Sequence, residues 1–142
     1  MNHARKLGPG AALLAALTLC GCGRPPLTPV QGKVSYKGTP LQGGVIVFAP
    51  DSTRGERGAI AVGKIREDGS YTLYTGEAPG AAAGWYRITV SALASASFSA
   101  PAGQGFNFPQ SLIPEKYRDP EQSLLACEVK ASRTNSIDFN LE

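Results

Sequence analysis

Cys20 and Cys22 are the residues whose type and spacing point most directly to chemistry. Two thiols at this spacing could provide half of a zinc site, or one of them could be covalently modified. A structural zinc ion takes about four ligands, usually from cysteine and histidine. The only histidine is His3, which lies in the N-terminal segment that precedes the two cysteines. The sequence therefore predicts no metal site, and no other cofactor is expected.

The segment before these cysteines has the features of a secretory signal. Arg5 and Lys6 precede an apolar run at residues 11–19. A basic stretch followed by a short apolar stretch is typical of exported proteins. A membrane-spanning helix needs about 20 apolar residues, so this run is too short to span a bilayer. Residues 1–21 are therefore predicted to be a signal peptide.

The tetrapeptide Leu19-Cys20-Gly21-Cys22 resembles the lipobox of bacterial lipoproteins, in which a small residue precedes the modified cysteine. Cys22 follows Gly21 and satisfies this pattern, whereas Cys20 follows the bulky Leu19. The resemblance implies cleavage between Gly21 and Cys22 and a diacylglyceryl group on the Cys22 sulfur. Two acyl chains give stable anchoring where one alone is marginal. The alternative is an ordinary secretory signal with incidental cysteines.

Composition limits the remaining chain to one domain that needs its own core. The 142 residues contain 14 Lys+Arg and 11 Asp+Glu. Because Arg5 and Lys6 belong to the signal, residues 22–142 are nearly neutral and give no electrostatic case for nucleic-acid binding. Cys127 has no intramolecular partner once Cys22 is acylated, so no disulfide framework is expected. Residues 22–29 (Cys22 and a Pro-rich run) are predicted to be an extended tether, and residues 30–142 the domain.

Residues 30–142 carry short apolar–polar alternations separated by Gly, Pro, Asp and Asn, which is typical of β-strands. Val45 to Ala49 are apolar at every position, which predicts a central strand that ends at Pro50. Tyr86, Ile88 and Val90 are expected to face the core. No amphipathic helix competes with this pattern, so we expect an all-β fold, a sandwich of about seven strands. The predicted strands cover residues 30–37, 45–49, 59–66, 71–74, 85–91, 125–130 and 137–142.

The connections between these strands are also predicted. Residues 37–40 should turn the chain, and Asp68-Gly69 should form a hairpin through a primed turn, because glycine tolerates positive φ. Residues 51–58 are expected to be a solvated loop and residues 75–84 a loop of small residues. The insert at 92–109 is predicted to be flexible, with aromatic side chains that either bind a partner or cover a sheet edge: Phe98, Phe106 and Phe108.

Two carboxylate pairs, Glu67 with Asp68 and Glu115 with Asp119, could in principle perform acid–base chemistry. Adjacent carboxylates on turns are usually solvated, and we favour that interpretation for both pairs. Ile113 and Tyr117 should instead pin the second segment onto the domain. Cys127, between Leu125 and Val129 on the inward side of a strand, is expected to be a small core residue rather than a reactive thiol.

The order of several segments resembles carboxypeptidase regulatory-like domains, especially the small lipoproteins of this type in planctomycete bacteria. The resemblance covers nearly all of the chain after Cys22 and implies a single seven-stranded, Greek-key, transthyretin-like β-sandwich. Such domains are usually non-catalytic accessory modules, so no catalytic residues carry over. The segments are 30–41, 43–48, 67–73, 84–90 and 113–120.

Three functional hypotheses follow. The first is a membrane-anchored binding or structural module at the cell envelope, facing the periplasm or the exterior and contacting another envelope protein or a glycan. The second is a carboxylate-dependent hydrolase; a histidine-assisted nucleophile is excluded because residues 22–142 contain no histidine. The third is transthyretin-like binding of a small ligand at an oligomer interface, which rests on fold analogy alone. We favour the first.

Overall fold

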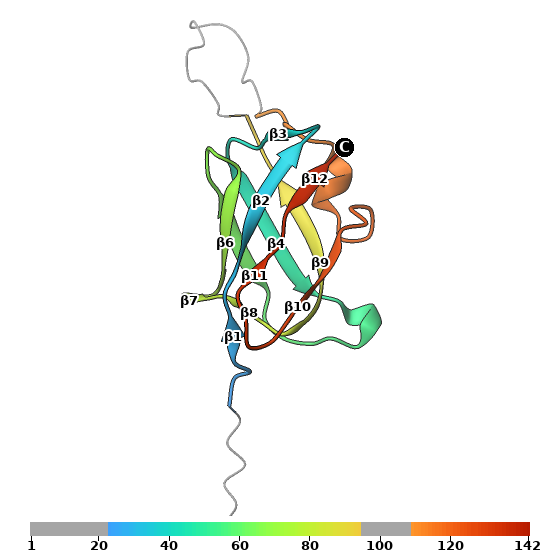
Figure 1. Ribbon diagram of the computed structural model, residues 1–142. Coiled ribbons are helices and arrows are strands. Elements are labelled where there is room, and N and C mark those ends of the chain that lie inside the picture. Colours follow the sequence, from blue (N-terminus) through green and yellow to red (C-terminus); the bar gives the residue numbers. More distant parts are fainter. Residues whose placement is uncertain (1–22, 95–108) are drawn as a thin grey trace, which may run out of the picture.

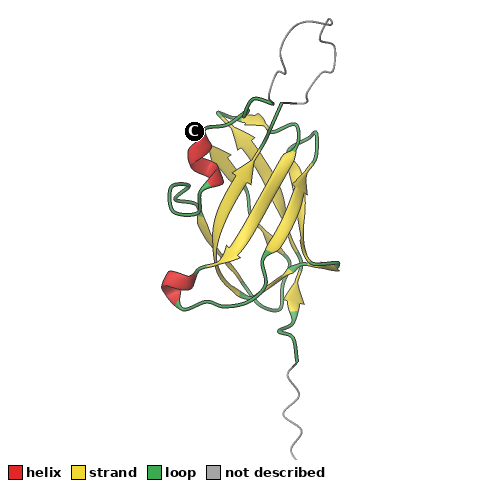
Figure 2. Ribbon diagram, turned by 180° about the vertical axis from the view of Figure 1, so that it is seen from behind, coloured by secondary structure: helices red, strands yellow, loops and turns green. Residues whose placement is uncertain are grey.

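A computed structural model describes residues 23–94 and 109–142, and these residues form an all-β domain, as predicted. Most strands belong to one curled sheet, and two short 3₁₀ turns are its helical elements among the described residues (Figures 1 and 2). The elements are β1 (Leu27–Thr28), β2 (Val30–Tyr36), β3 (Thr39–Pro40), β4 (Gly44–Pro50), η1 (Ser52–Arg54), β5 (Ala61–Ile65), β6 (Ser70–Thr75), β7 (Ala78–Pro79), β8 (Ala81–Ala82), β9 (Gly84–Ser91), η2 (Glu115–Arg118), β10 (Ala126–Val129), β11 (Asn135–Ser136) and β12 (Phe139–Leu141).

The main sheet has the order β10-β9-β4-β5-β6-β2-β11, with β12 and β3 also paired to β2 and β7 paired to β6. Its strands are antiparallel except that β11 and β12 run parallel to β2. β1 and β8 form a separate two-stranded pair. The curled sheet wraps around its own apolar inner face (Figure 2).

The core centres on Phe48, which is fully buried. Its ring centroid lies 6.2 Å from that of Tyr71, 5.8 Å from Tyr86 and 6.1 Å from Phe139. These residues come from β4, β6, β9 and β12, so one aromatic cluster joins strands that are far apart in the sequence. The prediction that Tyr86, Ile88 and Val90 face the core is confirmed.

β4 lies between β5 and β9, which confirms that residues 45–49 form a central strand ending at Pro50. Its two faces are not equivalent, although both are apolar. Ile46 and Phe48 are buried, whereas Val45 is 40% exposed on the outer face. On the neighbouring strands Val62 and Tyr74, which pair with each other, are exposed to a similar extent. A strand in the middle of the sheet can therefore have an apolar face that is partly exposed.

The two predicted turns differ in type. Lys37 and Gly38 have φ values of 48° and 79° and connect β2 to β3, which is the positive-φ pattern of a primed hairpin turn. Between β5 and β6 only Gly69 has a positive φ (79°), and its N–H donates to the Arg66 carbonyl. The prediction of a hairpin at Asp68-Gly69 is confirmed. The prediction of a primed turn is wrong, because the loop is longer and ends in a glycine with left-handed backbone angles.

The strand predicted at residues 137–142 is shorter in the structure, where it is β12, and a separate two-residue strand, β11, precedes it. Between β11 and β12 the backbone stays close to β2, since the Ile137 N–H donates to the Gln31 carbonyl at 2.9 Å. The Ile137 carbonyl accepts the Tyr71 hydroxyl at 2.6 Å, and Asp138 Oδ1 accepts the Lys33 N–H at 2.8 Å. Ile137 and Asp138 are therefore held by one backbone and two side-chain hydrogen bonds, although they lie outside both strands.

Three predicted loop segments contain more structure than expected. Residues 51–58 include η1 and the buried Asp51, so this loop is not wholly solvated. Residues 75–84 include β7 and β8. The predicted tether contains β1, since Leu27 and Thr28 pair with Ala82 and Ala81. Pairings as short as two residues leave no periodic pattern in a sequence.

The segment before β10 is pinned as predicted. Ile113 and Tyr117 are buried, and the Tyr117 hydroxyl donates to the Glu142 carbonyl at 2.8 Å. Only the ends of the insert at 92–109 are described: Ala92 is buried, and Leu93 forms a bridge with Ser111. The predicted aromatic surface of Phe98, Phe106 and Phe108 lies outside the described residues.

Candidate functional site

The predicted cleavage and lipidation residues, Gly21 and Cys22, lie outside the described residues. The described residues begin with Gly23 and β1 begins at Leu27, so four residues, 23–26, separate Cys22 from β1 in the sequence. Among the residues that the structure describes, no helix is long and apolar enough to span a bilayer.

In the first carboxylate pair, Glu67 with Asp68, the side chain of Asp68 has a structural role. Its Oδ1 accepts hydrogen bonds from the Ser70 hydroxyl at 2.6 Å and the Ser70 N–H at 3.0 Å. These bonds lower the pKa of the Asp68 carboxyl below its usual value. Asp68 is therefore a charged residue that fixes the β5–β6 turn, and a general acid needs the opposite shift.

The second pair, Glu115 and Asp119, lines one open hollow of about 490 Å³. Asp119 Oδ1 accepts the N–H groups of Glu121 at 2.7 Å and Gln122 at 3.2 Å, which fixes the turn after η2. Glu115 is exposed at the start of η2. The geometry supports the solvated, turn-forming interpretation of this pair.

Cys127 is half-buried on β10 and packs against the core. Burial raises the pKa of its thiol to about 12, so the thiolate is scarce at neutral pH. The expected behaviour is that of a small apolar residue, as predicted from the sequence.

We expect Cys127 to react much more slowly with a bulky maleimide in the folded protein than after unfolding in urea, since the thiolate is the nucleophile. Peptide mass mapping after timed labelling at neutral pH measures this rate for Cys127 alone. Equal rates for folded and unfolded protein would contradict the burial of this thiol.

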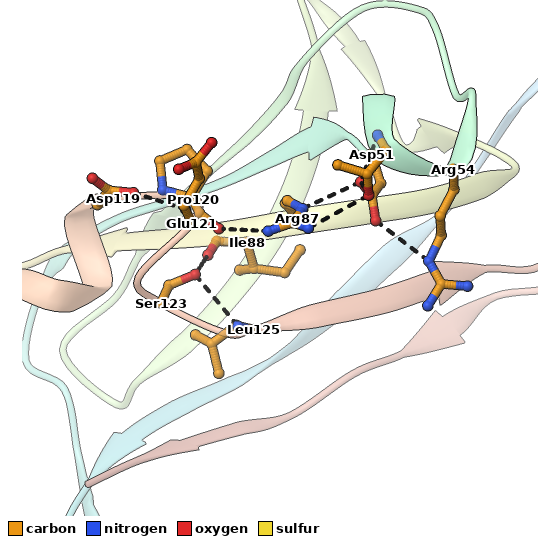
Figure 3. Close-up of polar contacts among 10 residues, drawn as sticks. Asp51, Arg54, Arg87, Ile88, Asp119, Pro120, Glu121, Ser123 and Leu125 are labelled. Carbon is orange, nitrogen blue, oxygen red and sulfur yellow. Dashed lines mark hydrogen bonds and ion pairs between the residues drawn. The ribbon is translucent and has the colours of Figure 1, made fainter.

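The most developed polar cluster, missed in the sequence, surrounds Asp51 at the end of β4 (Figure 3). Its carboxylate accepts the Thr53 hydroxyl at 2.6 Å and the Thr53 N–H at 3.1 Å. Arg87 Nε lies 3.2 Å from Oδ1, and Arg54 Nε lies 3.4 Å from Oδ2. The Thr53 hydroxyl above all, with Arg87, holds the pKa of Asp51 below its usual value even though burial opposes ionisation.

Arg87 links this cluster to the segment before β10. Its Nη1 donates to the Pro120 carbonyl at 3.3 Å, on the side opposite Asp51 (Figure 3). Nearby, the buried Ser123 hydroxyl donates to the Ile88 carbonyl at 2.7 Å. An open hollow of about 420 Å³ lies beside Arg87 and is lined by Ala49, Pro50, Ser52, Thr53, Pro120 and Glu121.

The guanidinium of Arg54 leaves the cluster on the other side and stacks 4.0 Å from the Trp85 ring centroid. The backbone N–H of Trp85 donates to Glu56 Oε1 at 3.2 Å. Loop residues 52–56 are thereby fixed against β9. The cluster can hold a loop in place and can offer hydroxyl and charged groups to a ligand, but Asp51 is already saturated with donors.

We expect Asp51→Asn to lower the melting temperature at pH 7, because the substitution removes the charge that both arginines approach. The pKa of Asp51 is lowered in the folded state, so its contribution is complete above about pH 4 and is lost as the pH falls below that value. The difference in melting temperature between wild type and variant should therefore narrow at pH 3. Glu115→Gln, an exposed carboxylate, serves as the control. A difference independent of pH would contradict the ionic role of Asp51.

Within residues 23–94 and 109–142 no three histidine, cysteine or carboxylate side chains gather as a metal site would require. No protein-family model, curated protein or solved structure matches the chain. The case for a function therefore depends on the N-terminal pattern and on the geometry described above.

Proposed function

We propose that this chain is a bacterial lipoprotein, acylated at Cys22, whose β-domain is a non-catalytic binding or structural module at the cell envelope. The observation that carries the proposal is the pattern Leu19-Cys20-Gly21-Cys22 after a short apolar run. The position of the fold supports it, because β1 begins at Leu27. The partner is another envelope protein or a glycan, and the domain faces the periplasm or the exterior.

We further propose that the curled sheet is a seven-stranded, Greek-key, transthyretin-like sandwich of the carboxypeptidase regulatory-like type. Within residues 23–94 and 109–142, seven strands have three residues or more: β2, β4, β5, β6, β9, β10 and β12. The neighbours β9-β4-β5-β6 support the topology, since three consecutive strands are followed by one that returns beside the first.

Replacing Cys22 with alanine is expected to move the protein from the membrane fraction to the soluble fraction. The acyl chains cannot then be attached, and each buried CH₂ contributes about 0.8 kcal/mol to membrane binding. Cys20→Ala is the matched control and should leave the protein in the membrane fraction. Immunoblotting of separated fractions measures both. Release by both variants, or by neither, would contradict acylation at Cys22.

The binding role is tested by in-cell crosslinking of the tagged protein, with quantitative co-purification against Cys22→Ala. We expect an envelope partner that is recovered with the anchored form and lost with the variant. Recovery of the same proteins with both forms would contradict a role that depends on the anchor.

Binding of a small ligand or glycan is a second candidate, favoured by the hollow beside Arg87 with its hydroxyls from Ser52 and Thr53. A glycan array probed with the wild type and with Thr53→Val tests this use of the hollow. Signals that vanish in the variant would support it, and signals unchanged by the substitution would exclude this hollow as the site.

A further inference from the structure

The chain enters the domain at one end of the sheet. β1 pairs with β8, and the start of β2 lies beside the turn at residues 130–134, because the Asn135 N–H donates to the Pro29 carbonyl at 2.9 Å. Figure 1 shows β1, β8 and this turn together at the end of the domain where the described chain starts. We name residues 23–29, β8 and the turn 130–134 the anchor end.

The anchor end cannot move far from Cys22. The path from Cys22 to Leu27 spans at most about 18 Å when fully extended. Pro25 and Pro26 restrict the backbone within it. An acyl group on Cys22 would therefore keep the anchor end, rather than the opposite end with β3, close to the lipid headgroups.

The turn 130–134 is held in a fixed shape by the buried Asn135. Asn135 Oδ1 accepts the Lys130 N–H at 2.9 Å, and Nδ2 donates to the carbonyls of Lys130 and Arg133, each at 3.0 Å. Both basic side chains are exposed. Little further ordering of the backbone is needed before these cations can contact a surface.

Basic residues outnumber carboxylates at this end, although residues 23–142 as a whole are nearly neutral. Two exposed carboxylates lie nearby: Glu77 in the turn between β6 and β7, and Glu128 on β10, two residues before the turn 130–134. The loop 55–60, which connects η1 to β5, adds one negative and one positive side chain, Glu56 and Arg57. The exposed cations of the anchor end itself are Arg24, Lys130 and Arg133.

We propose that the anchor end lies on an anionic phospholipid surface, which Arg24, Lys130 and Arg133 contact through their charges. This inference rests on the lipid anchor proposed above: the acyl chains hold the protein at the bilayer, and the cations determine which end faces it. Each cation close to an anionic membrane favours the contact roughly fivefold. The three together should shift the orientation on the order of a hundredfold.

The test uses the full-length lipidated protein, reconstituted into phosphatidylcholine vesicles with or without phosphatidylglycerol. A fluorophore is placed at Ala131→Cys in the anchor end, or at Thr39→Cys in β3 at the opposite end, each in a Cys127→Ala background. A quencher attached to lipid headgroups reports proximity to the membrane. With phosphatidylglycerol, we expect stronger quenching at position 131 than at 39, and the difference should shrink as salt is added.

Replacing Arg24, Lys130 and Arg133 with glutamine should reduce this difference to its value in phosphatidylcholine alone. The matched control replaces Lys37, Arg66 and Lys116 with glutamine, which removes the same charge outside the anchor end. This control should leave the difference in quenching between positions 131 and 39 unchanged. Equal quenching at both positions, or a difference indifferent to phosphatidylglycerol, would overturn the inference and leave the anchor intact. Failure of the protein to float with either kind of vesicle would overturn the proposed anchor itself.

Discussion

Phe48→Ala is expected to destabilise the domain by about 3–5 kcal/mol, the usual cost of removing a buried phenylalanine. Phe48 is fully buried, and its ring contacts aromatic rings from three other strands. The cavity would lie at the centre of the curled sheet, where β4 lies between β5 and β9 and cannot move freely. Urea unfolding followed by fluorescence or circular dichroism gives the change in free energy.

The matched control is Val47→Ala, the preceding residue on the outer face of β4. Val47 is only half-buried, so its truncation should cost about 1 kcal/mol or less. If the two substitutions had equal effects, the inner face of β4 would not be the centre of the core.

Gly32→Ala is expected to destabilise the domain by about 3 kcal/mol, at the upper end of the usual cost of overpacking. A Cβ at this position would lie 1.8 Å from the Ile137 carbonyl oxygen and 2.6 Å from its carbon. Both are backbone atoms, so the segment between β11 and β12 would have to leave β2. The Tyr71 hydroxyl would then lose its acceptor, the same Ile137 carbonyl.

Limited proteolysis and hydrogen exchange of the C-terminal residues measure this effect, and both should increase in Gly32→Ala. Gln31→Ala, on the exposed side of the same strand, is the control and should change stability by no more than about 0.5 kcal/mol. Unchanged protection of residues 135–142 in Gly32→Ala would contradict the close approach of the two backbones.

Strands with clear alternation could be predicted from the sequence. β2, β6 and β9 alternate apolar and polar residues because one face of each is buried, and that burial leaves a period of two in the sequence. β4 could be predicted from its apolar run, but its half-exposed outer face could not. Which apolar face remains uncovered depends on what packs against the sheet, and a single strand carries no information about that.

The Asp51 cluster could not be predicted, because its partners are distant in sequence. Arg87 is 36 positions from Asp51, and the Pro120 carbonyl is 33 positions from Arg87. A local signal did exist, since Asp51 followed by Thr53 is typical of a side chain that caps a turn. The burial of Asp51 followed only from the way β4 and β9 bring the loop and the arginine together.

The roles of the two carboxylate pairs, in contrast, could be predicted from the sequence. Asp68 and Asp119 each accept backbone N–H groups within their own turns, and such short-range bonds can be anticipated from sequence. The parallel pairing of β11 and β12 with β2 could not, since it joins the two ends of the domain. The importance of Gly32 was hidden for the same reason.

The central claim is that the mature chain begins at an acylated Cys22, and mass spectrometry of the N-terminal peptide tests it most directly. The protein is purified in detergent from the membranes of the cells that produce it and is digested before analysis. We predict an N-terminal peptide that starts at Cys22 and carries the added mass of a diacylglyceryl group. A peptide that begins at another residue, or an unmodified Cys22, would contradict the account.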